Sequence, residues 1–137
     1  MELRESVLVL LLKFRKAEDI ARALNVRLED VVSALNSLEA EGLVVKREEG
    51  LIFKKEVYEL TDRGYNEAQK LLNKLKELSE KIRLARERGD LKEVGDLLRT
   101  HALLLSLLVA FGMIDILMLS SFEDSADIDF DFDVVEF

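Results

Sequence analysis

Residues 43–60, LVVKREEGLIFKKEVYEL, decide the fold that this sequence predicts. Residues with a preference for β-strands occur in two runs, 43–45 and 51–60. The segment between them, 46–50, is polar and contains Gly50, the only glycine of the stretch. Because glycine and charged residues between two such runs favour a turn, we predict a β-hairpin with a charged tip.

Three short helices are predicted ahead of this hairpin, over residues 5–14, 17–24 and 28–41. Gly42 follows the third, where the end of a helix favours a residue that is free to adopt a positive φ. Three helices followed by a hairpin is the order of elements in a winged helix-turn-helix. The predicted fold class is therefore mainly α with a small β-hairpin wing.

Three motifs in this order resemble a known family. Residues 18–26, EDIARALNV, are similar to the second helix and turn of a helix-turn-helix. The apolar residues of 31–38, spaced four and three apart and followed by EGLV at 41–44, resemble a recognition helix that runs into a wing. Residues 58–64, YELTDRG, resemble the strand that returns from the wing. Over residues 1 to about 75 the sequence thus resembles winged-helix transcription regulators of the MarR, ArsR and PadR kind.

The resemblance implies a regulator that binds double-stranded DNA. In the family's binding mode the third helix, here 28–41, enters the major groove, and the wing touches the backbone or the minor groove. A basic wing over 46–55 would then lie on the DNA backbone. The residues that we expect at the DNA are Arg27, Ser33, Asn36, Ser37, Lys46, Arg47, Lys54 and Lys55.

The side chains of the third helix suit this contact only in part. Asn36 can read adenine, and Arg27 can pair with guanine or phosphate. Positions 33, 36 and 37 depart from the family pattern, however, because relatives usually carry Arg or Lys there. Two hypotheses follow: a DNA-binding regulator, favoured by the basic wing, and a winged-helix adaptor that binds other proteins, favoured by the uncharged helix face.

Acidic residues at the start of the third helix leave the same choice open. Glu29 and Asp30 repel phosphate if they face it, and they also stabilise the positive N-terminal end of the helix.

The net charge of the chain is −8, and it is unevenly distributed. Residues 1–65 carry −2, residues 66–100 carry +2 and residues 101–137 carry −8. Charge therefore does not exclude nucleic-acid binding by the first half.

A long amphipathic helix is predicted over 62–88, with a heptad seam of Ala68, Leu71, Leu75, Leu78, Ile82 and Ala85. The segment 88–90, RGD, interrupts the seam, and residues 91–119 predict a second helix that folds back antiparallel. The chain thus divides into a winged-helix domain at 1–65, a helical dimerisation hairpin at 66–119 and an acidic tail at 120–137.

The second helix of this hairpin is apolar on all sides, and one seam is too narrow to cover it. Fully burying a leucine is worth about 1.5 to 3 kcal/mol, so a partner subunit is the simplest cover and we predict an obligate homodimer. In one register with the dyad at Leu108, His101 of one chain faces Asp115 of the other. In the alternative, these two polar groups are solvated. The predicted dimer interface is Leu98, Leu104, Leu105, Leu108, Phe111, Gly112 and Asp115.

The tail contains DIDFDFDV at 127–134, in which acidic and apolar residues alternate. A period of two suits a strand with one buried face, and it also occurs in acidic disordered segments. Mimicry of a phosphate backbone, with the tail folding onto its own wing, is a further hypothesis. Four aspartates at alternate positions lack the loop and glycine of a calcium site, so no metal is predicted.

Catalytic motifs are missing from the sequence. It has no cysteine, one histidine, no glycine-rich phosphate loop, no GxSxG and no HExxH, so we expect no enzyme and no cofactor. No small-molecule ligand is evident. The abundance of Glu, Lys and Arg, with no proline, resembles heat-adapted proteins.

One apolar segment, 102–119, approaches the length of a transmembrane helix, although about 20 apolar residues are needed to cross a bilayer. Ser106, Gly112 and Asp115 interrupt it. No signal peptide is recognisable at the N-terminus. We expect a cytoplasmic protein, with a membrane-anchored regulator as the less favoured alternative.

Overall fold

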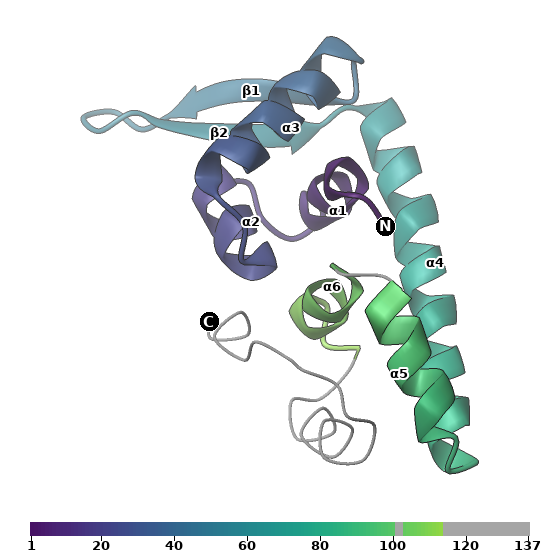
Figure 1. Cartoon of the computed structure of the whole chain (residues 1–137). Helices are drawn as coiled ribbons and strands as arrows, with labels where there is room; N and C mark the ends of the chain where they lie inside the picture. The colour runs from purple at the N-terminus through teal and green to yellow at the C-terminus, as the bar shows by residue number, and fades with distance from the viewer. Residues whose placement is uncertain (101–102, 114–137) are drawn as a thin grey trace.

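The structure is a computed structural model that describes residues 1–100 and 103–113. These residues form six helices and a two-stranded antiparallel hairpin, so the mainly α architecture with a small hairpin is confirmed (Figure 1). The elements are α1 (Leu3–Leu10), α2 (Ala17–Leu24), α3 (Leu28–Ala40), β1 (Val44–Glu49), β2 (Lys55–Leu60), α4 (Asp62–Glu87), α5 (Leu91–Thr100) and α6 (Leu104–Ala110).

Helices α1, α2 and α3 enclose the first part of the core. Leu8, Ile20 and Leu35 come one from each helix and are almost fully buried. The chain leaves α2 through Asn25, whose φ of 53° is left-handed, a conformation that asparagine tolerates better than most residues. After this sharp reversal, α3 begins three residues later, at Leu28. The predicted helix at 17–24 is confirmed, and the predicted helix at 28–41 differs by one residue.

The first helix differs more from its predicted range, 5–14. It begins at Leu3, where the N–H of Glu2 donates to the carboxylate of Glu5 over 3.3 Å and so closes the first turn. It ends at Leu10, and the chain turns over the next residues towards α2.

The hairpin is longer in its first strand and shorter in its second than the sequence suggests. Its register runs from Val44 opposite Leu60 to Glu49 opposite Lys55. The charged residues 46–49, predicted at the tip, are therefore part of β1. Residues 51–53, predicted within the second strand, lie instead in the turn. The prediction was wrong because these apolar side chains have no neighbouring strand to pair with once the chain reverses at Gly50, whose φ is 118°.

Thr61 joins the hairpin, the end of α3 and the start of α4. Its backbone N–H donates to the carbonyl of Leu43 over 3.0 Å, and its hydroxyl donates to the carbonyl of Gly42 over 2.8 Å. The same hydroxyl oxygen accepts from the N–H of Gly64 and caps α4. A Cβ at position 64 would lie 1.9 Å from the carbonyl oxygen of Leu43, so this close approach requires glycine.

The long helix α4 confirms the predicted helix over 62–88 and most of its apolar seam. Leu71, Leu75 and Ile82 are buried, and Leu78 is partly buried. Gly89 has a φ of 76° and reverses the chain where the sequence predicts a turn. Helix α5 then packs back along α4 (Figure 1).

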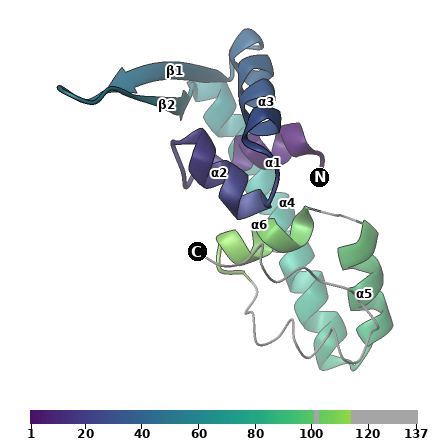
Figure 2. The ribbon, with the colours of Figure 1, turned by 60° about the vertical axis from the view of Figure 1, so that its left-hand side comes forward.

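The predicted single helix over 91–119 is wrong within the described residues. Helix α5 ends at Thr100, and a separate helix, α6, contacts both α2 and α4. Figures 1 and 2 show α6 below α2 and beside α4. The part of the apolar run that forms α6 therefore packs on the core of its own chain. Among the described residues, no helix is both long enough and apolar enough to cross a bilayer.

This packing corrects part of the predicted dimer interface. Leu98, Leu104 and Leu108 are at most 4% exposed in the single chain, so they are not free to form a contact surface with a partner. Leu105 and Phe111 are partly buried, and Gly112 is exposed. His101, Asp115 and the acidic tail lie outside the described residues, as does the predicted pairing of the first two.

Candidate nucleic-acid interface

The exposed face of α3 is polar and uncharged at its centre. Ser33, Asn36 and Ser37 are exposed, as the sequence predicts, because Leu35 and Leu38 of the same helix are turned into the core. In the described part of the chain, none of the three exposed side chains makes a hydrogen bond. Their hydroxyl and amide groups are available to an external partner.

Both ends of α3 carry negative charge. Glu29 and Asp30 lie in its first turn and Glu39 near its end, while the helix contains no Lys or Arg. Arg27 lies just before the helix, and its Nε is 3.5 Å from a carboxylate oxygen of Asp30 and 3.8 Å from one of Glu29. The one cation predicted at this end is therefore next to two carboxylates, which offset its attraction for phosphate.

Two of the four predicted hairpin cations are engaged in cross-strand ion pairs. Nζ of Lys46 lies 3.2 Å from Glu56, and the hydrogen bond between them raises the pKa of Lys46. Nε of Arg47 lies 3.1 Å from Glu59. Because Lys46 and Arg47 are adjacent in a strand, their side chains lie on opposite faces of the hairpin, and the structure does not bring them together.

The remaining hairpin cations, Lys54 and Lys55, make no ion pair with any described residue. They lie at the distal end of the hairpin, where the turn meets β2, and both are exposed. They also border a cavity of about 500 Å³ between the hairpin and α2. The residues that line it are Lys16, Glu18, Asp19, Arg22, Lys54, Lys55 and Glu56.

Lys16 and Arg22 are site residues that the sequence interpretation missed. Lys16 precedes α2, and Arg22 lies in its last turn, 3.6 Å from Asp19. Arg22 is an exposed cation on a helix whose apolar face was recognised, so its orientation was predictable. Its position opposite the hairpin lysines was not, because that depends on how the hairpin packs. Four cations and three carboxylates thus line one cavity.

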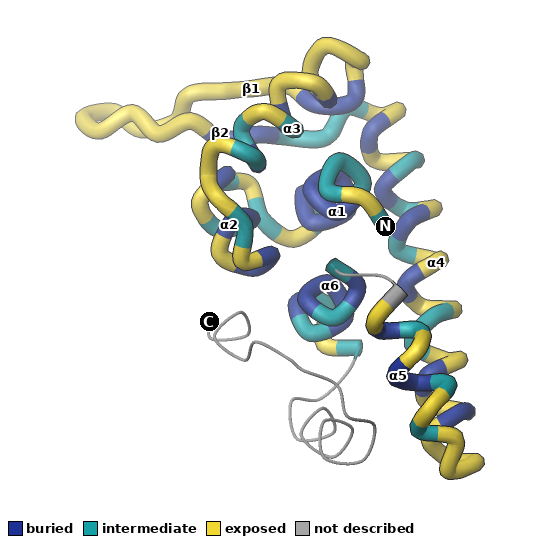
Figure 3. Tube along the Cα trace, viewed as in Figure 1, coloured by how far each residue is buried: buried dark blue, intermediate teal, exposed yellow. Residues whose placement is uncertain are grey.

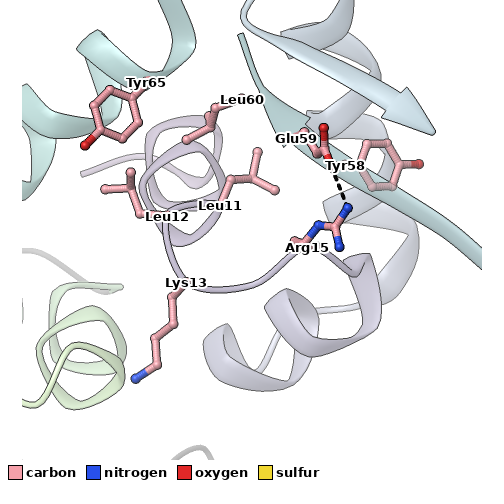
Figure 4. Close-up of a pocket in the computed structure, with 8 residues that line it drawn as sticks. All are labelled: Leu11, Leu12, Lys13, Arg15, Tyr58, Glu59, Leu60 and Tyr65. Carbon is pink, nitrogen blue, oxygen red and sulfur yellow. Dashed lines mark hydrogen bonds and ion pairs between the residues drawn. The ribbon is translucent and has the colours of Figure 1, made fainter. Parts of the chain in front are cut away.

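A second cavity, of about 340 Å³, lies at the base of the hairpin (Figure 4). Leu11, Leu12, Leu60 and Tyr65 give it apolar walls, and Lys13, Arg15, Tyr58 and Glu59 also line it. Its basic groups are already bound. Arg15 pairs with Glu49 and Glu59, and Nζ of Lys13 donates to the carbonyl of Ala110.

Arg15 also holds the hairpin through its backbone. Its carbonyl accepts from the N–H of Tyr58 over 2.8 Å, which fixes the loop between α1 and α2 against β2. Burial raises the pKa of the Tyr58 phenol. This second cavity therefore belongs to the support of the hairpin.

The most exposed apolar side chains of the described residues were not predicted as site residues. Leu51, Ile52 and Phe53 are exposed to 101%, 84% and 81% and lie between β1 and β2. Figure 3 shows the far end of the hairpin as exposed. We call these three residues the apolar tip. A signal for them was present in the sequence, since three apolar residues follow Gly50 directly, but β-propensity favoured a strand.

Groups of three or more His, Asp or Glu side chains arranged to hold a metal ion are not found in the described part of the chain. No protein-family model, no curated protein and no solved structure matches this chain.

Proposed function

We propose that this protein is a winged-helix regulator that binds double-stranded DNA as a homodimer, with α3 in the major groove and the β1–β2 hairpin as its wing. The observation that carries the proposal is the placement of two features next to each other. Helix α3, whose exposed face is polar and uncharged at its centre, is followed directly by the hairpin, which projects beyond it (Figures 1 and 2). Lys54 and Lys55, next to the turn of this hairpin, make no ion pair with a described residue.

The dimensions and chemistry of α3 suit the major groove. A helix with its side chains is about 10 to 12 Å across, and the major groove is about 12 Å wide. Asn36 at the centre of the exposed face can bind adenine through its amide, and Ser33 and Ser37 can bind bases or phosphates. Sequence readout then comes from hydrogen bonds, with little attraction from charge.

Affinity must come mainly from the hairpin and α2. The carboxylates of α3 repel phosphate, and Arg27, Lys46 and Arg47 are already paired with acidic side chains. Of the cations at the cavity between α2 and the hairpin, Lys16, Lys54 and Lys55 make no ion pair with a described residue and can neutralise phosphates, whereas Arg22 lies near Asp19. In a homodimer this set occurs twice.

Charge removal at the hairpin tests the proposal. The double variant Lys54→Gln and Lys55→Gln should weaken binding to mixed-sequence genomic DNA in a fluorescence anisotropy titration. It should also flatten the dependence of log K on log salt by about one unit for each phosphate that is no longer neutralised. The matched control is Lys76→Gln with Lys81→Gln, two exposed lysines of α4 far along the chain from the hairpin, which should leave both quantities unchanged. Equal weakening by both double variants would contradict the proposed interface.

A protein-interaction adaptor is the second candidate function. One observation favours it: α3 carries three carboxylates and no cation, while the nearby hairpin presents a bare apolar tip. Such surfaces are typical of contacts between proteins. If the wild-type protein has no DNA affinity at low salt, the adaptor replaces the regulator.

A further inference from the structure

The apolar tip is exposed without any cover in the described structure. Three consecutive large apolar side chains, Leu51, Ile52 and Phe53, are at least 81% accessible to solvent. Elsewhere in the described residues no exposed large apolar residue exceeds the 52% of Tyr65. A contiguous apolar group in water is unfavourable, and in soluble proteins it marks a contact site.

The tip lies at the end of a braced hairpin. The turn is closed at Gly50, where a Cβ would lie 2.1 Å from the carbonyl oxygen of Phe53. Ion pairs of Lys46 and Arg47 cross the two strands. Arg15 ties Glu49 near the turn to the loop between α1 and α2. The two strands that carry the tip are therefore braced, which lowers the entropy cost of presenting it to a partner.

Positive charge adjoins the tip and remains unpaired. Lys54 and Lys55 follow Phe53 directly and make no ion pair with a described residue, whereas the other two hairpin cations are paired. An apolar end beside two cations that make no ion pair with a described residue suits a partner with anionic groups outside and apolar surfaces inside. Duplex DNA has this chemistry on its minor-groove side, because phosphates line the edges of the groove and the apolar faces of the bases become accessible there once a base step is opened. We favour DNA over an anionic membrane as the partner because the hairpin directly follows α3, the helix that we propose to lie in the major groove.

We infer that the apolar tip is a wedge: it enters the minor groove and partly unstacks a base step, while Lys54 and Lys55 bind the flanking phosphates. Two hairpin strands lie about 4.8 Å apart, and with their side chains they exceed the minor-groove width of about 6 Å. Entry therefore widens the groove, and an inserted apolar side chain bends the duplex towards the major groove. This inference rests on the proposed function and adds to it the deformation of the DNA.

Two duplexes of the same sequence test the wedge, one fully paired and one with a central two-nucleotide bulge. A base step that is already unstacked costs less to open, so the wild-type full-length protein should bind the bulged duplex about tenfold more tightly. It should also bend the paired duplex, which fluorescence energy transfer between the DNA ends measures. The triple variant Leu51→Ser, Ile52→Ser and Phe53→Ser should lose the preference and the bend. It should keep the salt dependence of binding to the paired duplex, because its lysines are intact.

The matched control is Leu84→Ser, which removes an exposed leucine of α4 and should behave as the wild type. Circular dichroism verifies that each variant is folded. Equal affinity for both duplexes and unchanged bending by the triple variant would overturn the wedge and leave DNA binding intact. No binding of the wild type to either duplex would overturn the proposed function and the wedge together. Binding to phosphatidylserine vesicles that depends on the tip, without DNA bending, would assign the tip to a membrane surface instead.

Discussion

Arg15 positions the hairpin through both its side chain and its backbone. Its guanidinium pairs with Glu49 and Glu59, and its carbonyl holds the N–H of Tyr58. The side-chain hydrogen bonds raise the pKa of the Arg15 guanidinium, so it stays charged. The ion pairs of Arg15, Lys46 and Arg47 that brace the hairpin also neutralise most of the hairpin carboxylates. Among the described residues, these ion pairs leave Lys54 and Lys55 as the hairpin cations that can bind a polyanion.

Arg4 and Glu41 form a second bracing pair, between α1 and the end of α3, over 2.6 and 2.9 Å. The hydrogen bond from Arg4 holds the pKa of Glu41 below its ordinary value. A depressed pKa contributes stability above the unfolded-state pKa, and this is lost as pH falls through the lower folded-state pKa. Glu41→Gln should therefore melt at a slightly lower temperature than the wild type at neutral pH.

The difference in melting temperature should disappear in acid, once the wild-type carboxylate is protonated. Scanning calorimetry across this pH range measures it, and the effect is small because both side chains are about half exposed. Glu39→Gln is the control, since Glu39 makes no ion pair in the described part of the chain, and it should match the wild type throughout. A difference for Glu41→Gln that persists in acid would show that the side chain acts through packing.

At the scale of elements, the spacing of apolar residues predicted the helices well, but it predicted the strand limits and the cross-strand ion pairs poorly. Helix α2 and the apolar seam of α4 follow from local periodicity, which acts within each element. The exposed face of α3 follows from the same spacing. The strand limits were missed because cross-strand pairing depends on register, and the apolar tip has the composition of a strand without a partner for one. The pairing of Lys46 with Glu56 depends on that register and was equally inaccessible.

Helix α6 is the element on which the sequence interpretation failed most. Its apolar residues suggested a subunit interface, yet Leu108 is fully buried against its own chain. Leu108→Ala should lower the free energy of unfolding by about 2 to 5 kcal/mol, because it leaves a cavity. Urea denaturation should give the same loss at every protein concentration.

Leu105→Ala is the matched control, from the same helix and the same predicted interface. Leu105 is only partly buried, so its truncation should cost less. If the destabilisation by Leu108→Ala shrinks as protein concentration rises, Leu108 lies between subunits and the intrachain packing of α6 is contradicted.

For the whole molecule, the distribution of charge matters more than its total. The net charge of −8 is that of the last 37 residues, while the cations that adjoin α2 and the hairpin lie in the first half. The net charge of the whole chain argues against DNA binding, whereas the net charge of the first half permits it. What the sequence could not predict is which cations are already paired, since partners such as Glu56 and Glu59 are brought close only by folding.

The salt dependence of wild-type DNA binding tests the central claim most directly. If Lys16, Lys54 and Lys55 neutralise phosphates, log K should fall linearly with log salt with a slope of about −2.7 for one protomer and about −5 for a homodimer, at about 0.9 per phosphate. Anisotropy titrations of mixed-sequence duplex at several salt concentrations measure the slope. A slope in this range is the predicted result. Absence of binding at low salt, or a slope near zero, would contradict DNA binding by α3 and the hairpin.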